Sequence, residues 1–492
     1  MQTTRVITVS TAMVGLVALL ALNNSYTANG PDNKQWLAGD HHVHSRYSVG
    51  WDTDSNPPSP ILAADAVYPI PMNAVMGRRY GLDWMVSTDH GGPNHSRINR
   101  DYAYPELLEA RKAVPDMVLF YGMEFDTPGA DHSSIIVPKT DDEAGYLYQI
   151  ESRFAKNEPW PADPSWDSEG RMIEALSAMQ ELAEPPVVIA HHPSRSATGL
   201  GEYGMTEPSE LRAWNDTAPA IAVGMEGAPG HQAAMLSRQP LSQEGAENPL
   251  GAAGSAYVGR GAYGRYPTMG GFDQMTAQVG GFWDSMLAEG RRWWITANSD
   301  SHRHWSEGGV DFWPGEYSKT YILAERNHHS ILESLRQGRV FVTIGDLISE
   351  LWLTAAAGEM ETDIGGTLKA AAASDVTVTI KFRPPRKPNA HGDRPEVNRV
   401  DLIVGKVTAP VSDPSTSATD STQVVARFSS DDWQIEGDYR VIQYTLSEVD
   451  APMYLRVRGT NTDELEPAVD VGGESPWGDL WFYSNPIFVE LN

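Results

Sequence analysis

The hydrophobic pattern changes once along the chain. From Gln35 to about Thr343, short apolar runs alternate with amphipathic stretches of helical period. This alternation is typical of a sheet or barrel whose strands are connected by crossover helices, which is an α/β architecture. The apolar runs predict strands at 35–39, 82–87, 117–123, 133–137, 186–190, 220–225 and 293–298. Helices are predicted at 105–113, 169–183, 272–292 and 328–337, the last followed by Gly338 as a C-terminal cap.

From about Ile348 onward the apolar positions recur with period two, and long helical stretches are missing from the pattern. Strands are predicted at 375–382, 400–407, 423–428, 440–446, 453–459 and 487–491. Short strands at this spacing, separated by Pro, Ser, Asp and Gly, indicate a small antiparallel β-sandwich. We therefore divide the chain into residues 1–34, an α/β barrel domain at 35–346 and a sandwich domain at 347–492.

Two long insertions interrupt the first domain, at 140–167 and 227–271. Loops of this length are often lids or binding loops. The Gly-rich part of the second insertion carries Tyr257, Tyr263 and two candidate substrate-binding cations, Arg260 and Arg265. The alternative for this segment is a solvated excursion without a role in binding.

The N-terminus contains an apolar run from Val6 to Leu22, preceded by Arg5 and followed by a polar linker. Such a run predicts a secretory signal, and hence export to a periplasm or beyond. Tyr26 is bulky where a cleavage site prefers a small residue, so an uncleaved membrane anchor is the alternative.

Charge and composition restrict the chemistry. The 492 residues carry a formal net charge of −28, which disfavours nucleic acid as a partner because that binding relies on cations displacing counterions. The chain has no Cys, so a metal would have to be held by imidazole and carboxylate groups. Fourteen His residues are available for that purpose.

Histidine and acidic residues follow most of the predicted strands. His42 and His44 are two residues apart, so they project from the same side of an extended segment, whereas His41 faces the other way and is expected to pack or to support the ligands. The other strand-end residues are Asp89, His90, Glu124, His132, His191, His192, Asp300 and His302. Because barrels of this type gather their strand ends at one rim, these residues predict a multinuclear metal site. Hard ligands without thiolate suit Zn, Mn or Fe.

The order HxH, TDH, E, H, HP, DxH, spread over residues 35–343, resembles the PHP (polymerase and histidinol phosphatase) family of metal-dependent phosphoesterases. The resemblance implies a distorted (β/α)7 barrel that holds up to three metal ions. It assigns the first ion to His42, His44, Glu124 and Asp300, the second to Glu124, His132 and His192, and the third to His90, His302 and one further residue.

That further residue departs from the family pattern. Many relatives have SDG after the HxH pair, whereas Ser48, Val49 and Gly50 stand here. Asp52 is the nearest acidic residue that could replace the missing ligand, and Asp54 is the alternative. His191 and His192 form a doublet. The family has its ligand His directly before Pro, which favours His192 over His191, although adjacent residues at a strand end could exchange roles.

The run from Ser318 to Thr343 and the C-terminal segments YLRVRG and YSNPIFV are similar to those of exported two-domain members, some of which are similar to carbaryl hydrolases. This resemblance rests on framework residues rather than on ligands.

These observations predict a secreted hydrolase that uses a metal-activated water on a small-molecule substrate. A phosphomonoester or phosphodiester is the first hypothesis, and a carbamate, amide or carboxylic ester is the second, because a metal hydroxide attacks either centre. A non-enzymatic binding module is the third. Glu124 and Asp300 are the expected catalytic residues, with His95 as a proton donor or else a hydrogen-bonded loop residue. Arg46 and Arg97 join Arg260 and Arg265 as candidate substrate contacts, each of which could instead be structural.

Overall fold

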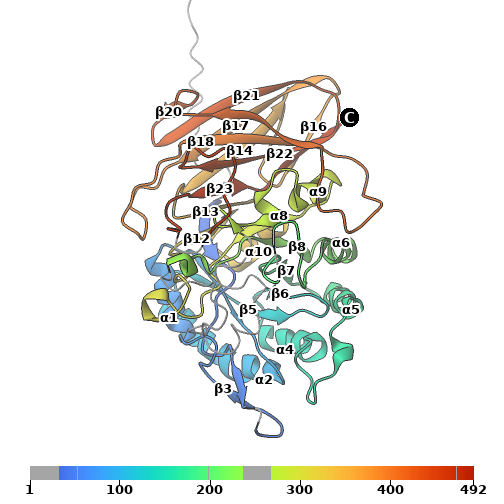
Figure 1. The fold of residues 1–492 in the computed structure, drawn as a ribbon, viewed down its shortest axis with the longest axis vertical. Helices are drawn as coiled ribbons and strands as arrows, with labels where there is room; N and C mark the ends of the chain where they lie inside the picture. The colour runs from blue at the N-terminus through green and yellow to red at the C-terminus, as the bar shows by residue number, and fades with distance from the viewer. Residues whose placement is uncertain (1–32, 53, 198, 237–267, 472–473) are drawn as a thin grey trace, which may run out of the picture.

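A large mixed sheet organises the chain, and a separate five-stranded antiparallel sheet lies beside its C-terminal strands (Figure 1). The computed structural model describes residues 33–492 apart from 53, 198, 237–267 and 472–473. The predicted signal segment therefore lies outside the described residues. Among the residues that are described, no helix is long and apolar enough to cross a membrane.

The first part of the large sheet has the strand order β11-β8-β7-β6-β5-β4-β1-β12-β13. Its strands are β1 (Gln35–Asp40), β4 (Trp84–Asp89), β5 (Val118–Asp126), β6 (His132–Ile136), β7 (Val187–Ala190), β8 (Ala222–Ala228), β11 (Trp294–Ala297), β12 (Ser318–Ala324) and β13 (Val340–Ile344). Each strand predicted upstream of residue 300 is confirmed, with ends shifted by a few residues. β5 is buried along its whole length, as expected of a central strand covered on both faces.

The predicted crossover helices imply parallel strands throughout, but the observed sheet is mixed. β1, β4 and β5 run parallel, as do β7, β8 and β11, but β6 is antiparallel to both of its neighbours and β12 is antiparallel to β1. The connection between β5 and β6 is too short for a crossover, which permits only a hairpin. As a result, His132 at the start of β6 pairs with Asp126 at the end of β5.

The described strands also do not form a closed ladder, because the sheet ends at β11. Side-chain bonds connect this edge to β12 instead. The Thr320 hydroxyl accepts a hydrogen bond from the Ala297 N–H at 2.8 Å and donates to the Ala297 carbonyl at 2.6 Å. The architecture is therefore mixed α/β with a curved sheet rather than a fully hydrogen-bonded barrel.

Helices cover the α/β part on its outside (Figure 1). They are α1 (Ile70–Arg79), α2 (His95–Ile98), α3 (Tyr104–Ala113), α4 (Glu143–Phe154), α5 (Glu169–Gln180), α6 (Pro208–Thr217), α8 (Gln274–Ala277), α9 (Phe282–Ala288) and α10 (His328–Arg336). Short helical turns lie at η1 (Asn99–Ala103), η2 (Pro164–Trp166), η3 (Gln232–Leu236) and η4 (Trp305–Glu307), and short strands at β2 (Gly50–Asp52), β3 (Ser59–Ile61), β9 (Thr268–Met269) and β10 (Phe272–Asp273).

Three of the four predicted helices are present, and the fourth was wrong in its extent. The segment 272–292 is divided into β10, α8 and α9, with Gly280 at a φ of 77° between the two helices. The insertion at 140–167 was expected to be irregular, but α4 occupies much of it and buries Leu147 and Phe154. The cap at Gly338 is confirmed by its φ of 67°, a conformation that glycine adopts without a steric penalty.

The C-terminal third is antiparallel, as predicted, with one parallel exception between β16 and β24. Its strands are β14 (Glu350–Ala357), β15 (Met360–Asp363), β16 (Thr367–Ala370), β17 (Ser374–Arg383), β18 (Arg399–Lys406), β19 (Thr422–Phe428), β20 (Gln434–Glu436), β21 (Tyr439–Val449), β22 (Met453–Thr460), β23 (Trp481–Ser484) and β24 (Ile487–Leu491). β23 pairs with β13, so one face of the sandwich continues the large sheet. The rings of Phe382 in β17 and Phe482 in β23 lie 6.3 Å apart, which places the two sheets in contact.

Candidate metal centre

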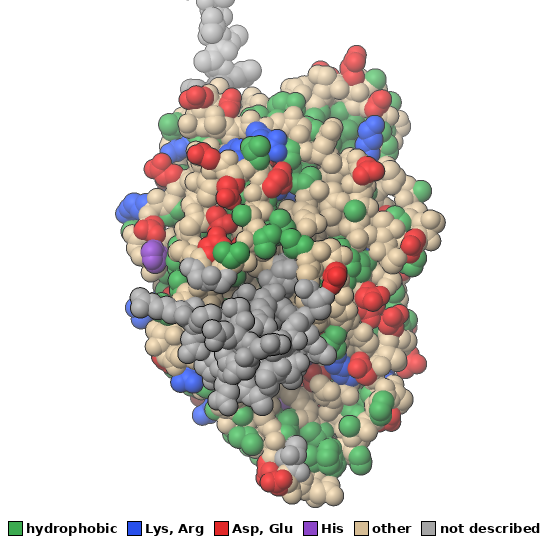
Figure 2. All heavy atoms as spheres, in the orientation of Figure 1, with side chains coloured by type: hydrophobic (Ala, Val, Ile, Leu, Met, Phe, Trp, Pro, Cys, Tyr) green, Lys and Arg blue, Asp and Glu red, His purple; other side chains and the backbone are tan. Residues whose placement is uncertain are grey.

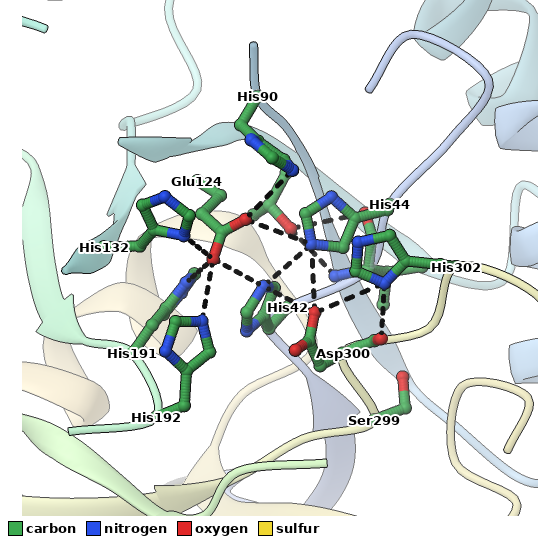
Figure 3. A network of polar contacts seen from close by, with 12 residues as sticks. His42, His44, His90, Glu124, His132, His191, His192, Ser299, Asp300 and His302 are labelled. Atoms are coloured by element: carbon green, nitrogen blue, oxygen red, sulfur yellow. Dashed lines mark hydrogen bonds and ion pairs between the residues drawn. The ribbon is translucent and has the colours of Figure 1, made fainter. Parts of the chain in front are cut away.

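The carboxyl ends of the α/β strands meet in one buried cluster of imidazoles and carboxylates (Figure 3). Short loops after β1, β4, β7 and β11 supply most of its members, β5 supplies Glu124, and the antiparallel β6 supplies its first residue, His132. The cluster contains the predicted ligands His42, His44, His90, Glu124, His132, His192, Asp300 and His302. Strands that are parallel end at one edge of a sheet, which explains why residues so distant in the chain converge.

Glu124 stands at the centre of the cluster and is 3% exposed. Its Oε1 lies 2.8 Å from His132 Nδ1 and 3.1 Å from His192 Nε2. Its Oε2 lies 3.4 Å from His44 Nε2 and 3.5 Å from His90 Nε2. The two oxygens thus face different sets of imidazoles, as a carboxylate that bridges two cations would.

His42 and His44 both direct Nε2 at Asp300. His44 Nδ1 is 2.8 Å from Ser48 Oγ, whose own proton is donated to Asp89, so His44 donates from Nδ1 and its Nε2 carries a lone pair. His42 Nδ1 is likewise engaged, 2.8 Å from a Glu226 oxygen. The two Nε2 atoms lie 2.9 Å apart, and each is 3.0 Å from Asp300 Oδ1.

The buried Asp300 carboxylate is surrounded by imidazoles: its Oδ1 lies 3.0 Å from Nε2 of both His42 and His44, and its Oδ2 faces His231 Nε2. Carboxylates and imidazoles buried this close together require positive charge among them, because burying an ionised group is costly unless it is paired. The donor set of imidazole and carboxylate is the one that borderline and hard divalent metals prefer. These buried His, Glu and Asp groups are therefore positioned to hold a metal ion.

The electrostatics of the cluster also favour added positive charge. Burial alone would raise the pKa of Asp300, but His231 and His42 hold it well below its ordinary value. Burial alone would lower the pKa of His42, yet Asp300, Glu226 and Glu124 raise it well above the ordinary value. The carboxylates thus stay ionised in the interior and attract a cation.

A further group of His44, His90 and His302 lies at the more exposed side of the cluster. Asp65 completes it: its Oδ2 is 3.0 Å from His90 Nε2 and 3.4 Å from His302 Nε2. Burial opposes ionisation of Asp65, but His302 and His90 hold its pKa well below the usual range.

Asp52 does not take this position, which corrects the expectation from sequence. It is exposed at the end of β2, and its Oδ1 accepts a hydrogen bond from the Asp54 N–H at 3.0 Å. β2 and β3 form a hairpin that carries Asp52 and Asp54 outward, and the chain returns to the cluster only after it. Asp65 is the first acidic residue on that returning segment.

The His191–His192 doublet offers two imidazoles where the prediction preferred His192. His191 Nδ1 is 2.9 Å and His192 Nε2 is 3.1 Å from the same oxygen of Glu124. His191 is also fixed by Ser134 Oγ, 2.5 Å from its Nε2, and its ring stacks on that of His42 with centroids 3.5 Å apart. Both rings are therefore candidate ligands beside Glu124.

Buried carboxylates fasten the backbone of the ligand loops. Asp40 accepts hydrogen bonds from the N–H groups of His42 and Ser299, both at 3.1 Å. Asp311 does the same for His302 at 2.8 Å and Arg303 at 3.0 Å. Such bonds offset the cost of burying each carboxylate and fix the loops in place.

Several of these residues have unfavourable backbone conformations. His192, His231 and Asp300 have φ values of 24°, 60° and 47°, which non-glycine residues rarely adopt. Strain of this kind persists where the surroundings over-determine it, and it gathers at functional sites.

Besides Asp65, three members of the site were not predicted from the sequence: Glu226, His231 and Asp311. Glu226 immediately follows the predicted strand at 220–225 and contacts His42, and burial raises the pKa of this carboxyl to about 7. His231 lies between two carboxylates. Its Nδ1 is 2.5 Å from Asp311 Oδ1, and its Nε2 faces Asp300. A rule that examined every acidic residue at a strand end would have found Glu226, whereas Asp311 lies in a loop without such a signal.

His41 supports the cluster, in agreement with its predicted orientation. It is fully buried, with Nδ1 2.9 Å from Ser134 Oγ and Nε2 2.8 Å from Thr296 Oγ1. Burial lowers its pKa to about 3, so the ring is neutral. It connects β1 to β6 and β11 beneath the ligands.

His95 is not placed to protonate a leaving group. It is fully buried, with Nδ1 2.6 Å from Glu151 Oε1 and Nε2 2.8 Å from the Tyr47 carbonyl. Burial would lower its pKa, but Glu151 raises it to about 9, so both nitrogens carry protons and both are engaged. His95 fixes the loop that carries His44.

Of the predicted cations, the structure describes two, Arg46 and Arg97, and neither forms a hydrogen bond or ion pair with the described residues of the cluster. Arg46 is paired with Glu106, its Nη2 lying 2.6 Å from the carboxylate, and Arg97 is exposed on α2. Arg260 and Arg265 lie outside the described residues. A cation that the sequence did not single out, Arg195, is bound to Asp131 at 2.5 Å, next to the His192 loop.

No protein-family model and no curated protein matches this chain.

Proposed function

We propose that this protein is a metal-dependent hydrolase of small phosphomonoesters or phosphodiesters. One observation carries the proposal: the Nε2 atoms of His42 and His44 converge on the buried Asp300 carboxylate, inside a larger cluster of ligand-type side chains. A structural site needs only one closed ligand set, whereas adjacent sets that share a carboxylate are typical of hydrolytic centres.

We infer that two or three divalent ions, Zn, Mn or Fe, are held there. His42, His44 and Asp300 would hold one ion with Glu124. Glu124 would also serve a second with His132 and one or both residues of the doublet. His90, His302 and Asp65 would hold the third.

Bound ions of this kind would lower the pKa of a coordinated water and neutralise charge on the substrate's oxygens. The protein's own groups would orient the substrate and manage protons. His231 is suited to hold a proton at Nε2 against Asp300, because Asp300 and Asp311 raise its pKa to about 9 despite burial. Asp311 fixes that ring through Nδ1.

Exposure indicates where a substrate would enter. The side chains of His42 and His44 are fully buried, whereas those of His90 and Asp65 are 22% and 40% exposed. The substrate would therefore approach the cluster from the side of His90 and Asp65, which suits a small molecule.

A carbamate, amide or carboxylic ester is the second candidate, and the entrance favours it in one respect. Ile61 and Leu62, in the segment that leads to Asp65, are 48% and 47% exposed. Apolar side chains next to an entrance suit an apolar acyl or aryl substituent.

Two finer expectations belong to the same proposal. A PHP-type barrel is supported by the order of the ligand strands and by the side-chain bonds between Thr320 and Ala297 across the open edge. Export from the cell, with a small-molecule substrate rather than nucleic acid, is supported by the apolar N-terminal run and the net charge of −28. Acidic side chains are more prominent than basic ones on the face in Figure 2.

The test is a metal analysis of the purified protein followed by paired assays on nitrophenyl phosphate, bis(nitrophenyl) phosphate and an aryl carbamate. Glu124→Gln and Asp300→Asn should bind less metal and lose hydrolysis, while Glu210→Gln, a buried carboxylate change at the start of α6, should retain both. Turnover of the carbamate alone would replace the first candidate by the second, and a protein that binds no divalent metal would exclude both.

A further inference from the structure

Glu226, near the end of β8, lies beneath the cluster and has no role in the proposed ligand sets. Its side chain is fully buried. Oε1 is 2.8 Å from His42 Nδ1, and Oε2 accepts a hydrogen bond from the His192 backbone N–H at 2.5 Å. One carboxylate therefore contacts two residues that belong to different parts of the candidate metal centre.

We propose that Glu226 is a positioning residue that fixes His42 in its metal-binding tautomer and couples the ligand set of His42 to that of His192. This inference rests on the proposed function, because it assigns a role toward ions bound by those residues. When the ring of His42 is neutral and its proton lies on Nδ1, which faces Glu226 at 2.8 Å, the lone pair that a metal ion needs is left on Nε2. That atom faces Asp300 Oδ1 at 3.0 Å and Glu124 Oε1 at 3.3 Å.

Glu226 is not itself placed as a ligand to the same ion. The two nitrogens of an imidazole lie on opposite sides of the ring, so a group at Nδ1 of His42 is turned away from an ion at Nε2. Both Glu226 oxygens already face N–H groups. A carboxylate that orients the far nitrogen of a ligating histidine is a recurrent arrangement, and its loss typically weakens metal binding by about 10- to 100-fold.

The backbone bond to His192 adds the coupling. His192 has a φ of 24°, a conformation that a non-glycine residue holds only when it is fixed by neighbours. The Glu226 bond to its N–H is such a restraint, and the His192 ring then reaches Glu124 at 3.1 Å. A disturbance at Glu226 would therefore be felt at both His42 and His192.

A glutamine is the informative replacement because it keeps the shape but has only one acceptor oxygen. If that oxygen receives the His192 N–H, the amide NH₂ faces His42 Nδ1 and donates to it. The ring proton of His42 then moves to Nε2, where it blocks metal binding. If the amide is flipped, the NH₂ opposes the His192 N–H, and the restraint on that loop is lost.

The experiment is a calorimetric titration of the metal-free full chain with Mn²⁺ and Zn²⁺, comparing wild type, Glu226→Gln and Glu210→Gln. The control removes a carboxylate that is also buried, 3% exposed, but caps α6. We expect about 10- to 100-fold weaker binding of at least two ions in Glu226→Gln, unchanged binding in the control, and an unchanged far-ultraviolet circular dichroism spectrum in both. If the amide variant does not fold, Glu226→Asp, which keeps the charge but is too short to reach both groups, is measured with the same expectation.

A double-mutant cycle separates positioning from a general loss of stability. In a His42→Ala background, Glu226→Gln should weaken the first metal-binding event much less than it does in wild type, since the ring it orients is gone. Wild-type affinity in Glu226→Gln, or full additivity in the cycle, would overturn the inference. Wild type that binds no metal at all would instead refute the proposed function.

Discussion

Replacing Asp65 by Asn tests the least expected ligand of the centre. Asp65 is separated from the HxH pair by the β2–β3 hairpin, and its carboxylate lies 3.0 Å from His90 and 3.4 Å from His302. Asn keeps the size of the side chain and removes the charge. We expect the ion held by His90 and His302 to bind more weakly, while the ions held around Glu124 are retained.

The magnitude follows from Coulomb's law. A unit charge pair separated by about 3.4 Å interacts with about 1 kcal/mol at the dielectric constant of water and about 5 kcal/mol at an effective value near 20. Because the Asp65 side chain is 40% exposed, the lower half of this interval applies. A loss of about 2 kcal/mol corresponds to roughly 30-fold weaker binding of that ion.

The assay counts metal by mass spectrometry after dialysis against a buffered free-metal concentration, and it measures the weakest affinity by competition with a chelating dye. Asp52→Asn is the matched control, since Asp52 is exposed on the same hairpin and bonds only its own loop among the described residues. If Asp65→Asn keeps the wild-type stoichiometry and affinity, or if Asp52→Asn loses an ion, the assignment of Asp65 is wrong.

Further predictions concern stability. Removing metal with a chelator should lower the melting temperature, and adding metal back should raise it with concentration, because ions that bind only the folded state stabilise it. A melting temperature that does not respond to metal would contradict the proposed metal site. His95 has a folded pKa of about 9 against an ordinary 6.5, so its stabilisation is complete below pH 6.5 and is lost as pH rises through 9. The difference in unfolding free energy between wild type and His95→Gln should therefore be about 3 kcal/mol larger at pH 6 than at pH 10, as measured by denaturant titration. Gly224→Ala should destabilise the protein by several kcal/mol, since its Cβ would lie 2.0 Å from the Trp294 carbonyl oxygen, and unchanged urea midpoints would refute this.

Periodicity was sufficient to locate the strands of the α/β region and most ligands at their ends. Apolar runs are strong signals because a central strand such as β5 is buried along its whole length. Glu124 and His132 could be predicted for this reason. The hairpin between β5 and β6 was not predicted, because parallel strands were expected and the short connection between these two strands was not considered.

Periodicity could not identify the site residues that lie on loops. Asp52 and Asp65 differ in sequence only by their distance from His44, and the β2–β3 hairpin decides between them. The failed helix at 272–292 has a related cause: its apolar period continues through Gly280 and Gly281, whose conformations interrupt it. The sequence could not decide whether His95 is a proton donor or a hydrogen-bonded loop residue, because its partners, Glu151 and the Tyr47 carbonyl, are distant in the chain.

The buried polar groups of the site differ in their hydrogen-bond partners, and this difference says more about function than the number of such groups does. Asp40, Glu226 and Asp311 are buried but accept backbone N–H groups, so the cost of their burial is offset within the protein. Asp300 and the Nε2 atoms of His42 and His44 lie in the same interior but face one another, at 3.0 Å, instead of backbone N–H groups. A cation among these atoms would offset the cost of burying them, as the backbone N–H groups do for the other carboxylates. His42, His44 and Asp300 are therefore positioned to hold a metal ion, and the carboxylates around them fix the loops that carry these side chains.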